Sequence, residues 1–306
     1  MAIKTAGSLK ALEYVVESDF GTLPETAFSY GGRLVTLNPT AGYEIETVVA
    51  DGSRNVDLIT WGKQTVGLSA EMGMYKDSGD YAWTQWLELA LGDSDSSAER
   101  GDIDSFEVYV EAASDQHYLY HGCKIDTLTI SAESVGGQAT ATVDAVCMYA
   151  EMAATRAELA SNTEATEPSL NPVTHNSYPK ATMSDGETSY DVPAMSYTYT
   201  IANALTSKEG IVTVGDSDEG LALAAGSAII PDGELEITAE YTVVSDSLTW
   251  DRLKNAMTED VTIEHTIGGH TLKLTGCWMP GDDLPSRSQS VYDETVTFKA
   301  KNIGWS

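Results

Sequence analysis

The residue types best suited to chemistry lie together in one short segment, where His117, His121 and Cys123 are separated by even spacings. On a β-strand this spacing places all three side chains on one face. Imidazole nitrogen and thiolate sulfur are both zinc ligands. A later segment of similar pattern carries Thr271 and Thr275 in place of the two histidines. We therefore favour a half-buried strand with incidental histidines over a zinc site, and we predict no metal and no cofactor.

Segments that approach catalytic or nucleotide-binding motifs are incomplete. The run Gly215-Asp216-Ser217-Asp218-Glu219 lacks the final glycine of a nucleophile elbow. Before Lys63, Asp57 stands where a phosphate-binding loop needs its first glycine, and Gln64 replaces the loop's Ser or Thr. Neither segment supports a nucleophile or a phosphate site.

The remaining candidates also point away from an active site. Residues 93–97 begin like a calcium loop, but Ala98 replaces the glycine of the sharp turn and Asp104 replaces the bidentate glutamate. We interpret this run as a solvated surface loop. His175, His265 and His270 lack a partner pattern specific enough for a catalytic triad. The chain is predicted not to be an enzyme, and its catalytic, cofactor-binding and metal residues are predicted to be none.

Short alternating strands separated by Gly, Asn, Asp and Ser turns occupy most of the chain. Residues 106–111 alternate Phe, Val and Val with Glu, Tyr and Glu, and residues 127–148 form a predicted hairpin around Gly136-Gly137. Residues 139–149, which include the second arm of this hairpin, and residues 294–301 are predicted long alternating strands. The fold class is therefore predicted to be mainly β.

Two short helices are expected within this β-rich pattern. Trp83, Trp86, Leu87 and Ala90 form a stripe of helical spacing behind Asp80, a candidate N-cap. The second helix is expected from a similar stripe of Trp250, Leu253 and Met257. These tryptophans are interpreted as core residues that cover a sheet, because large aromatic side chains bury the most area.

The order of elements is repeated along the chain. Each half has a strand ending in Ala-Glu (Ala70-Glu71 and Ala239-Glu240), a helix, a strand, a strand ending in Gly-Cys, and a long closing strand. We interpret this echo as duplication of a domain of about 140 residues, with chance similarity between β-rich segments as the alternative. The predicted division is a first domain at 1–153, a linker or surface excursion rich in Pro, Ser and Thr at 154–193, and a second domain at 194–306.

Bulk composition limits the functional class. The 306 residues carry a formal net charge of -30, which opposes binding to a phosphate backbone because such binding depends on Lys and Arg. The acidity fits either an ordinary acidic soluble protein or a halophilic host whose molar salt screens the repulsion. Cys123, Cys147 and Cys277 form an odd, sparse set that fits free buried thiols in a reducing compartment. No apolar stretch is long enough to span a membrane, and residues 1–5 lack the core of a secretory signal.

The segment from Tyr14 to Pro24 (YVVESDFGTLP) resembles the N-terminal segment of tail proteins of tailed bacteriophages and archaeal viruses. In those proteins an aromatic residue, an acidic residue and a Gly-Thr-x-Pro turn precede an extended arm. The next elements also occur in a similar order: a long polar loop at 35–64, a strand ending near Glu71, a helix and antiparallel strands. Together these features resemble tail tube proteins, here with a duplicated tube domain.

The resemblance implies two tandem β-sandwich or barrel domains, each with one short helix, in a siphovirus-type virion tail assembled in the host cytoplasm. It implies trimeric, pseudo-hexameric rings, or hexameric rings, stacked with other tail proteins into a tube through which genomic DNA passes without specific binding. The expected interface segments are the N-terminal arm and the loops at 35–64 and 208–233. Residues 127–148 and 289–301 are candidates for the lumen sheet.

Two other readings remain open. One is a different β-rich virion or cell-surface assembly protein, such as a tail terminator, decoration protein or surface-layer domain. The other is an enzyme or carbohydrate-binding module, which would need exposed aromatic platforms such as Trp61 or Trp278.

Overall fold

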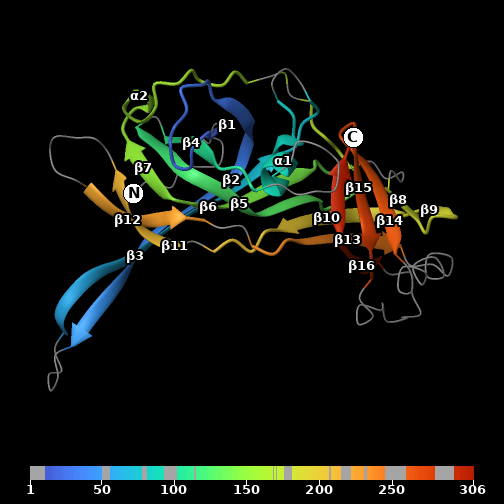
Figure 1. Cartoon of the computed structure of the whole chain (residues 1–306). Coiled ribbons are helices and arrows are strands. Elements are labelled where there is room, and N and C mark those ends of the chain that lie inside the picture. The colour runs from blue at the N-terminus through green and yellow to red at the C-terminus, as the bar shows by residue number, and fades with distance from the viewer. Residues whose placement is uncertain are drawn as a thin grey trace.

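Antiparallel strands dominate the computed structural model (Figure 1). The structure describes residues 11–49, 56–77, 81–92, 102–113, 115–167, 169, 171–175, 181–206, 208–214, 222–230, 233–244, 260–279 and 293–306. Most of the described residues lie in strands, and the two described helices are short. The predicted mainly β fold is confirmed.

The described elements occur in a fixed order along the chain. The strands are β1 (Ala11–Val16), β2 (Ser29–Val49), β3 (Val56–Gly73), β4 (Phe106–Ala113), β5 (Gln116–Ala132), β6 (Thr140–Cys147), β7 (Tyr149–Ala153), β8 (Ala181–Ser184), β9 (Ser189–Asp191), β10 (Ala194–Ala202), β11 (Lys208–Val214), β12 (Ala222–Ile229), β13 (Glu236–Val244), β14 (Val261–Ile267), β15 (His270–Cys277), β16 (Asp293–Ala300) and β17 (Asn302–Trp305). The helices are α1 (Gln85–Leu91) and α2 (Arg156–Leu159).

The first part of the chain closes into a barrel. Backbone pairing runs in the order β5-β4-β1-β2-β3-β6, and β6 then pairs with β5. Closure leaves no free edge along the barrel wall where the strands pair. The predicted hairpin at 127–148 is present as the second half of β5 and β6, joined by a turn that contains Gly136 with φ +81°.

The second part of the chain extends the barrel's sheet and adds another sheet beside it. β10 pairs with the second half of β5, and β13 and β16 follow in order. A separate five-stranded sheet has the order β17-β15-β14-β8-β9 (right side of Figure 1). One cluster of buried side chains runs from Leu12 and Trp86 in the barrel to Leu274 and Phe298 in the second part. The two parts therefore share a core.

The two segments predicted as long loops are largely strands. Residues 35–64 form most of the long hairpin of β2 and β3, which projects from the body (Figure 1), and residues 208–233 contain the paired strands β11 and β12. The loop prediction was wrong because backbone pairing does not require apolar side chains. Val, Ile and Thr within these polar segments favour extended structure.

Helix α1 packs against the barrel as predicted, although it begins later. Trp83, Trp86, Leu87 and Ala90 are all buried, but the helix starts at Gln85, with Thr84 at the N-cap position and no side-chain capping bond. Trp83 lies in the turn before the helix. The predicted cap Asp80 and the predicted second helix around Trp250 lie outside the described residues.

The segment at 154–193 contains regular structure that its composition does not indicate. Arg156 of α2 forms a bidentate ion pair with Glu13 of β1, with both N–O distances 2.9 Å. Its guanidinium also lies 4.1 Å from the ring centroid of Tyr109 and 5.1 Å from that of Phe28. Further along, β8 pairs with β14. These contacts fix the segment on the outside of the barrel and join it to the second sheet.

Candidate functional site: a hydroxyl-lined sheet face

The predicted shared face of His117, His121 and Cys123 is wrong, because a bulge at Gly122 interrupts the alternation. Phe106 pairs with Cys123 while Val108 pairs with Tyr120, so β5 contains one extra residue at this point. Gly122 accommodates it with φ +58°, a conformation that glycine adopts readily. Cys123 therefore lies in the main core, whereas the two histidines lie on the other face of β5.

The two histidines contact protein groups. The Nδ1 atom of His117 lies 2.5 Å from the Tyr109 hydroxyl, and Nδ1 of His121 lies 2.6 Å from a carboxylate oxygen of Glu107. Glu107 belongs to the polar alternation of β4, yet it is fully buried. Within the residues that the structure describes, no group of three His, Cys, Asp or Glu side chains has the arrangement of a metal site. Cys123, Cys147 and Cys277 are free and buried, as predicted.

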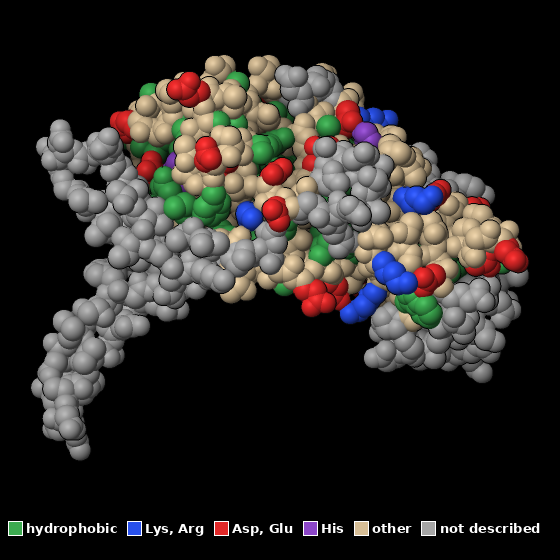
Figure 2. Space-filling model, viewed as in Figure 1, with side chains coloured by type: hydrophobic (Ala, Val, Ile, Leu, Met, Phe, Trp, Pro, Cys, Tyr) green, Lys and Arg blue, Asp and Glu red, His purple; other side chains and the backbone are tan. Residues whose placement is uncertain are grey.

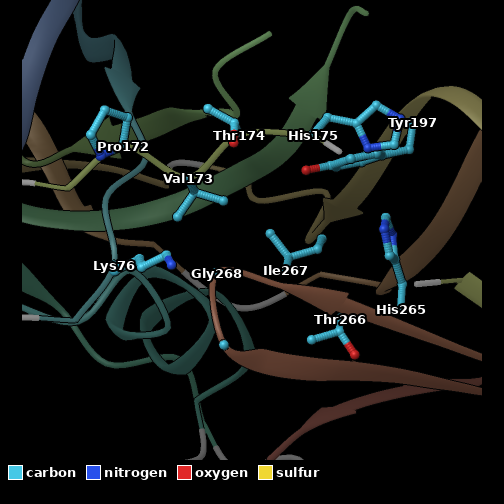
Figure 3. A pocket seen from close by; sticks show the side chains of 11 residues that line it. Lys76, Pro172, Val173, Thr174, His175, Tyr197, His265, Thr266, Ile267 and Gly268 are labelled. Carbon is cyan, nitrogen blue, oxygen red and sulfur yellow. The ribbon is translucent and has the colours of Figure 1, made fainter. Parts of the chain in front are cut away.

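The other histidines line or border a pocket between the barrel and the second sheet (Figure 3). Its volume is about 240 Å³, and its lining includes Lys76, His175, Tyr197 and His265. The Nε2 atom of His175 donates to the Ala194 carbonyl at 3.0 Å, and Nδ1 of His265 lies 2.5 Å from the Tyr199 hydroxyl. His270, outside the pocket, pairs with Asp77 at 2.5 Å. Backbone carbonyl, tyrosine and exposed carboxylate partners do not make a catalytic triad.

The other candidate residues are distributed as follows. Trp83 and Trp86 are core residues, as predicted. Trp278 is 41% exposed at the edge of β16, where it bridges to Lys299. The acidic run at 215–219 and residues 93–101 of the calcium-like loop lie outside the described residues, as does Trp250. Residues 57–64 lie in strand β3 instead of a phosphate-binding loop.

A continuous sheet face carries the most distinctive chemistry of the described surface. Six strands pair in the order β3-β6-β5-β10-β13-β16. One side of each strand is buried, and the other side carries mostly Ser and Thr. We call this side the hydroxyl face; its hydroxyl residues are Ser69, Thr127, Thr129, Ser131, Thr140, Thr142, Ser196, Thr198, Thr200, Thr238, Thr242, Thr295 and Thr297.

The strand register aligns these hydroxyls in rows across the sheet. One row runs from Glu71 of β3 through Thr142, Thr129, Thr200 and Thr238 to Lys299 of β16. The adjacent row includes the pair Ser131 and Thr140, whose oxygens lie 3.3 Å apart. Cross-strand Thr and Ser pairs stabilise such a sheet while leaving a polar surface.

Charge on the hydroxyl face is sparse and mainly negative. Its carboxylates are Glu71, Asp144, Glu236 and Glu240, and its ammonium groups are Lys124 and Lys299. Lys299 is neutralised locally by Glu236 at 2.5 Å. Near the C-terminal strands, Lys273 lies beside Glu264 and Lys301 lies beside Asp260, and blue and red side chains are adjacent on this part of the surface (Figure 2). Few lysines and several carboxylates do not favour binding of a phosphate backbone.

Both ends of the six-stranded sheet have edges that the described residues leave open. Next to β3 in the sheet lies β2, which pairs with β1 only over residues 29–33. On the side of β2 that faces away from β3, residues 34–49 therefore have no described partner. At the other end, β16 pairs with β13, and the described contact on its outer side is the bridge to Trp278. Open edges are templates for pairing with another chain.

Comparison with known proteins agrees with this architecture. A family model described as phage tail tube protein matches residues 7–300. The chain belongs to the phage tail tube protein family. No individual curated protein matches it.

Family membership makes this chain a structural tail tube protein and a component of the virion tail, assembled with other tail proteins. Within the described residues, neither helix is both long and apolar enough to cross a membrane. The tail tube resemblance derived from the sequence is therefore confirmed. The alternation of Thr at 139–149 and 294–301 indicated strands with one polar side. The order of strands that brings these polar sides together in the hydroxyl face was not predicted.

Proposed function

We propose that this tail tube protein forms rings that stack into a hollow tube, and that the hydroxyl face lines the lumen through which viral DNA passes. The observation that carries the proposal is a six-stranded sheet with a continuous hydroxyl surface and an open edge at each end. A lumen must let DNA slide without retaining it. Hydroxyls and scattered carboxylates suit this task, because phosphate binding requires clusters of Lys and Arg.

We further propose that the chain contains two copies of the tube domain. The support is a set of matched pairings: β1–β4 with β8–β14, β2–β3 with β10–β13, β3–β6 with β13–β16, and β5–β7 with β15–β17. Because β8 takes part, the second copy in this proposal begins at Ala181, within the segment first predicted as a linker.

The Gly-Cys pairs give the most specific support for duplication. Cys123 pairs with Phe106, the first residue of β4, and Cys277 pairs with Val261, the first residue of β14. A register shift follows in both strand pairs. The preceding glycines, Gly122 and Gly276, have φ angles of +58° and +62°. A bulge at the same point of both sheets is difficult to explain by chance similarity of β patterns.

Two copies per chain favour rings of three chains with pseudo-sixfold symmetry. Inside the chain, the copies join where β5 of the first pairs with β10 of the second. In the proposed ring, the open edge of β2 belongs to the next chain. It occupies the position in that chain junction that β10 occupies inside a single chain. The β2–β3 hairpin projects from the body (Figure 1), which suits contact with the next ring. Closing the sheet around the ring would pair the edges that the described residues leave open.

The proposal is tested by negative-stain electron microscopy of purified protein and two matched variants. Val35, at the bulge on the open part of β2, and Val16, at the end of β1, are both 44% exposed. Val35→Lys places a charge on the edge and is expected to abolish tubes while leaving a folded monomer; Val16→Lys is expected to form tubes. Wild-type protein that stays dispersed under all salt conditions, or normal tubes from Val35→Lys, would contradict the proposal.

A further inference from the structure

A buried group of titratable side chains lies on the outer face of the barrel, away from the hydroxyl face. Glu107 of β4 is fully buried, and its carboxylate lies 2.6 Å from Nδ1 of His121 on β5. The second ring nitrogen of His121 lies 3.9 Å from Glu151 of β7, and the ring stacks on Tyr149 at a centroid distance of 4.2 Å. Neither Glu107 oxygen and neither His121 nitrogen makes a hydrogen bond of regular geometry.

Glu17 connects this group to the turn that follows β1. One of its carboxylate oxygens accepts a hydrogen bond from the Gly21 amide and the other accepts one from the Gly122 amide, both at 2.8 Å. Glu17 thus ties the turn at 17–21 to the bulge of β5. Its carboxylate also lies next to that of Glu107. Phe20, in the same turn, lies over Gly122.

The geometry points to a proton-operated latch. While Glu107 and His121 keep their protons, Glu17 stays in place and the turn at 17–21 is clamped on the barrel. When those protons are lost, the carboxylates of Glu17, Glu107 and Glu151 surround a neutral imidazole, and their repulsion releases the turn. This inference does not depend on ring formation.

The pKa shifts have the sign that the latch requires. Burial raises the pKa of Glu107 to about 8. Burial lowers the pKa of His121, but the contacts with Glu107 and Glu151 outweigh it and raise the value to about 9. The same imidazole lowers the pKa of Glu151. The buried thiol of Cys123, which is near Glu107 and Glu17, has a raised pKa and stays neutral.

The direction of the pH effect follows from these shifts. The folded cluster binds protons more tightly than the unfolded chain does, so its contribution to stability is lost as pH rises. For His121, this contribution is complete below its ordinary pKa of 6.5 and disappears as pH rises through about 9. For Glu107, the loss begins near 4.5 and ends near 8. The latch is therefore expected to open in the mildly alkaline range.

The second part of the chain provides an internal control. By the strand pairings, Thr275 and Asn302 occupy the positions of His121 and Tyr149, and Gly304 occupies that of Glu151. Thr262, one residue after the Val261–Cys277 pair, takes the place of Glu107. The bulge at Gly276 thus has no counterpart of the buried Glu107 and His121 pair; the charged side chain beside it is the exposed Lys301, which pairs with Asp260. This bulge should not respond to pH in the same way.

The test is hydrogen exchange measured by mass spectrometry on the full chain. Labelling on the millisecond time scale is done at pH 6.5 and 9.5, and the data are corrected for the intrinsic exchange rates of the amides at each pH. We expect protection of residues 17–22 to fall at least about tenfold, because the raised pKa of His121 alone corresponds to about a hundredfold over this pH range when opening exposes the cluster fully. Residues 270–277 are expected to change less than about threefold by the same linkage, and Glu107→Gln is expected to remove the pH response of 17–22.

Three outcomes would overturn the latch: unchanged protection of 17–22, parallel loss in both segments, or a wild-type response in Glu107→Gln. If that variant does not fold, NMR titration of the His121 ring in the wild type decides the question. A ring that stays charged through pH 7.5 supports the latch, and an ordinary midpoint near 6.5 refutes it.

Discussion

Substituting Gly122 by alanine tests whether the bulge of β5 is held by backbone conformation alone or also by packing. A β-carbon at Gly122 would lie 2.9 Å from Cβ of Met148 and 3.1 Å from the Phe20 ring. Gly136 has a similar positive φ, +81°, but a β-carbon there meets nothing within 4 Å. Gly276 is intermediate, because its β-carbon would meet the exposed side chain of Lys301. Alanine substitutions at these three glycines therefore separate the cost of a positive φ angle from the cost of steric overlap.

The magnitudes follow from the same geometry. Alanine in the left-handed region costs about 1–2 kcal/mol, and the loss of unfolded-state entropy offsets about 0.4–1 kcal/mol. Gly136→Ala should therefore destabilise the protein by about 0.5–1 kcal/mol. At Gly122 the overlap adds about 1–3 kcal/mol, because the Met148 β-carbon is attached to backbone and cannot rotate away. Gly122→Ala should cost about 2–4 kcal/mol. Gly276→Ala should fall between the other two variants, because the γ- and δ-carbons of Lys301 can move away but its β-carbon, 3.1 Å from the new methyl group, cannot.

Urea unfolding of the unassembled protein at pH 7, followed by tryptophan fluorescence, measures these differences as shifts in midpoint at constant slope. The expected order of stability loss is Gly122→Ala, then Gly276→Ala, then Gly136→Ala. If Gly122→Ala were within about 0.5 kcal/mol of Gly136→Ala, packing over the bulge would contribute nothing, and the reasoning would be refuted.

Other predictions address the outer clamp, the charge and the hairpin. Arg156→Ala leaves Glu13 buried without its partner and should cost about 2–4 kcal/mol in urea unfolding, whereas Arg156→Lys, which keeps the charge, should cost less; equal losses would contradict a contribution from the charge alone. If the charge of -30 reflects a halophilic host, the melting temperature should rise by about 5 °C or more between about 0.1 and 2 M NaCl; full stability in dilute buffer opposes that origin. Deleting residues 39–64 removes the projecting part of the β2–β3 hairpin, and electron microscopy should then show no tubes while circular dichroism still shows a folded β protein; normal tubes would exclude this hairpin from the assembly.

The sequence was most informative where a pattern is local. Alternation in β5, β6 and β16 identified those strands, and the stripe that includes Trp86 and Leu87 identified α1, because side-chain periodicity depends only on neighbouring residues. It was least informative where a single residue changes the register. The even spacing of His121 and Cys123 suggested one face, yet the bulge at Gly122 separates them.

Composition led to wrong predictions at the two hairpins and in the segment at 154–193. Polar residues there suggested loops and a linker, but backbone amides and carbonyls pair across β2–β3 and β11–β12 regardless of side-chain polarity. The burial of Glu107 was also unpredictable, because the residues that cover it are distant in sequence: Glu17 precedes it by 90 positions, and Glu151 follows it by 44.

By itself the sequence determined the β-rich class, the absence of complete catalytic motifs, the repeated order of elements and the resemblance to tail tube proteins. These features depend on residue type and short-range spacing. Only the tertiary structure decided that the strands of both halves join as β3-β6-β5-β10-β13-β16, that their Thr and Ser side chains align on one face, and that a charged cluster is buried on the other side of the barrel. Strand order and register depend on pairings between distant segments, and local patterns do not encode which partner each edge receives.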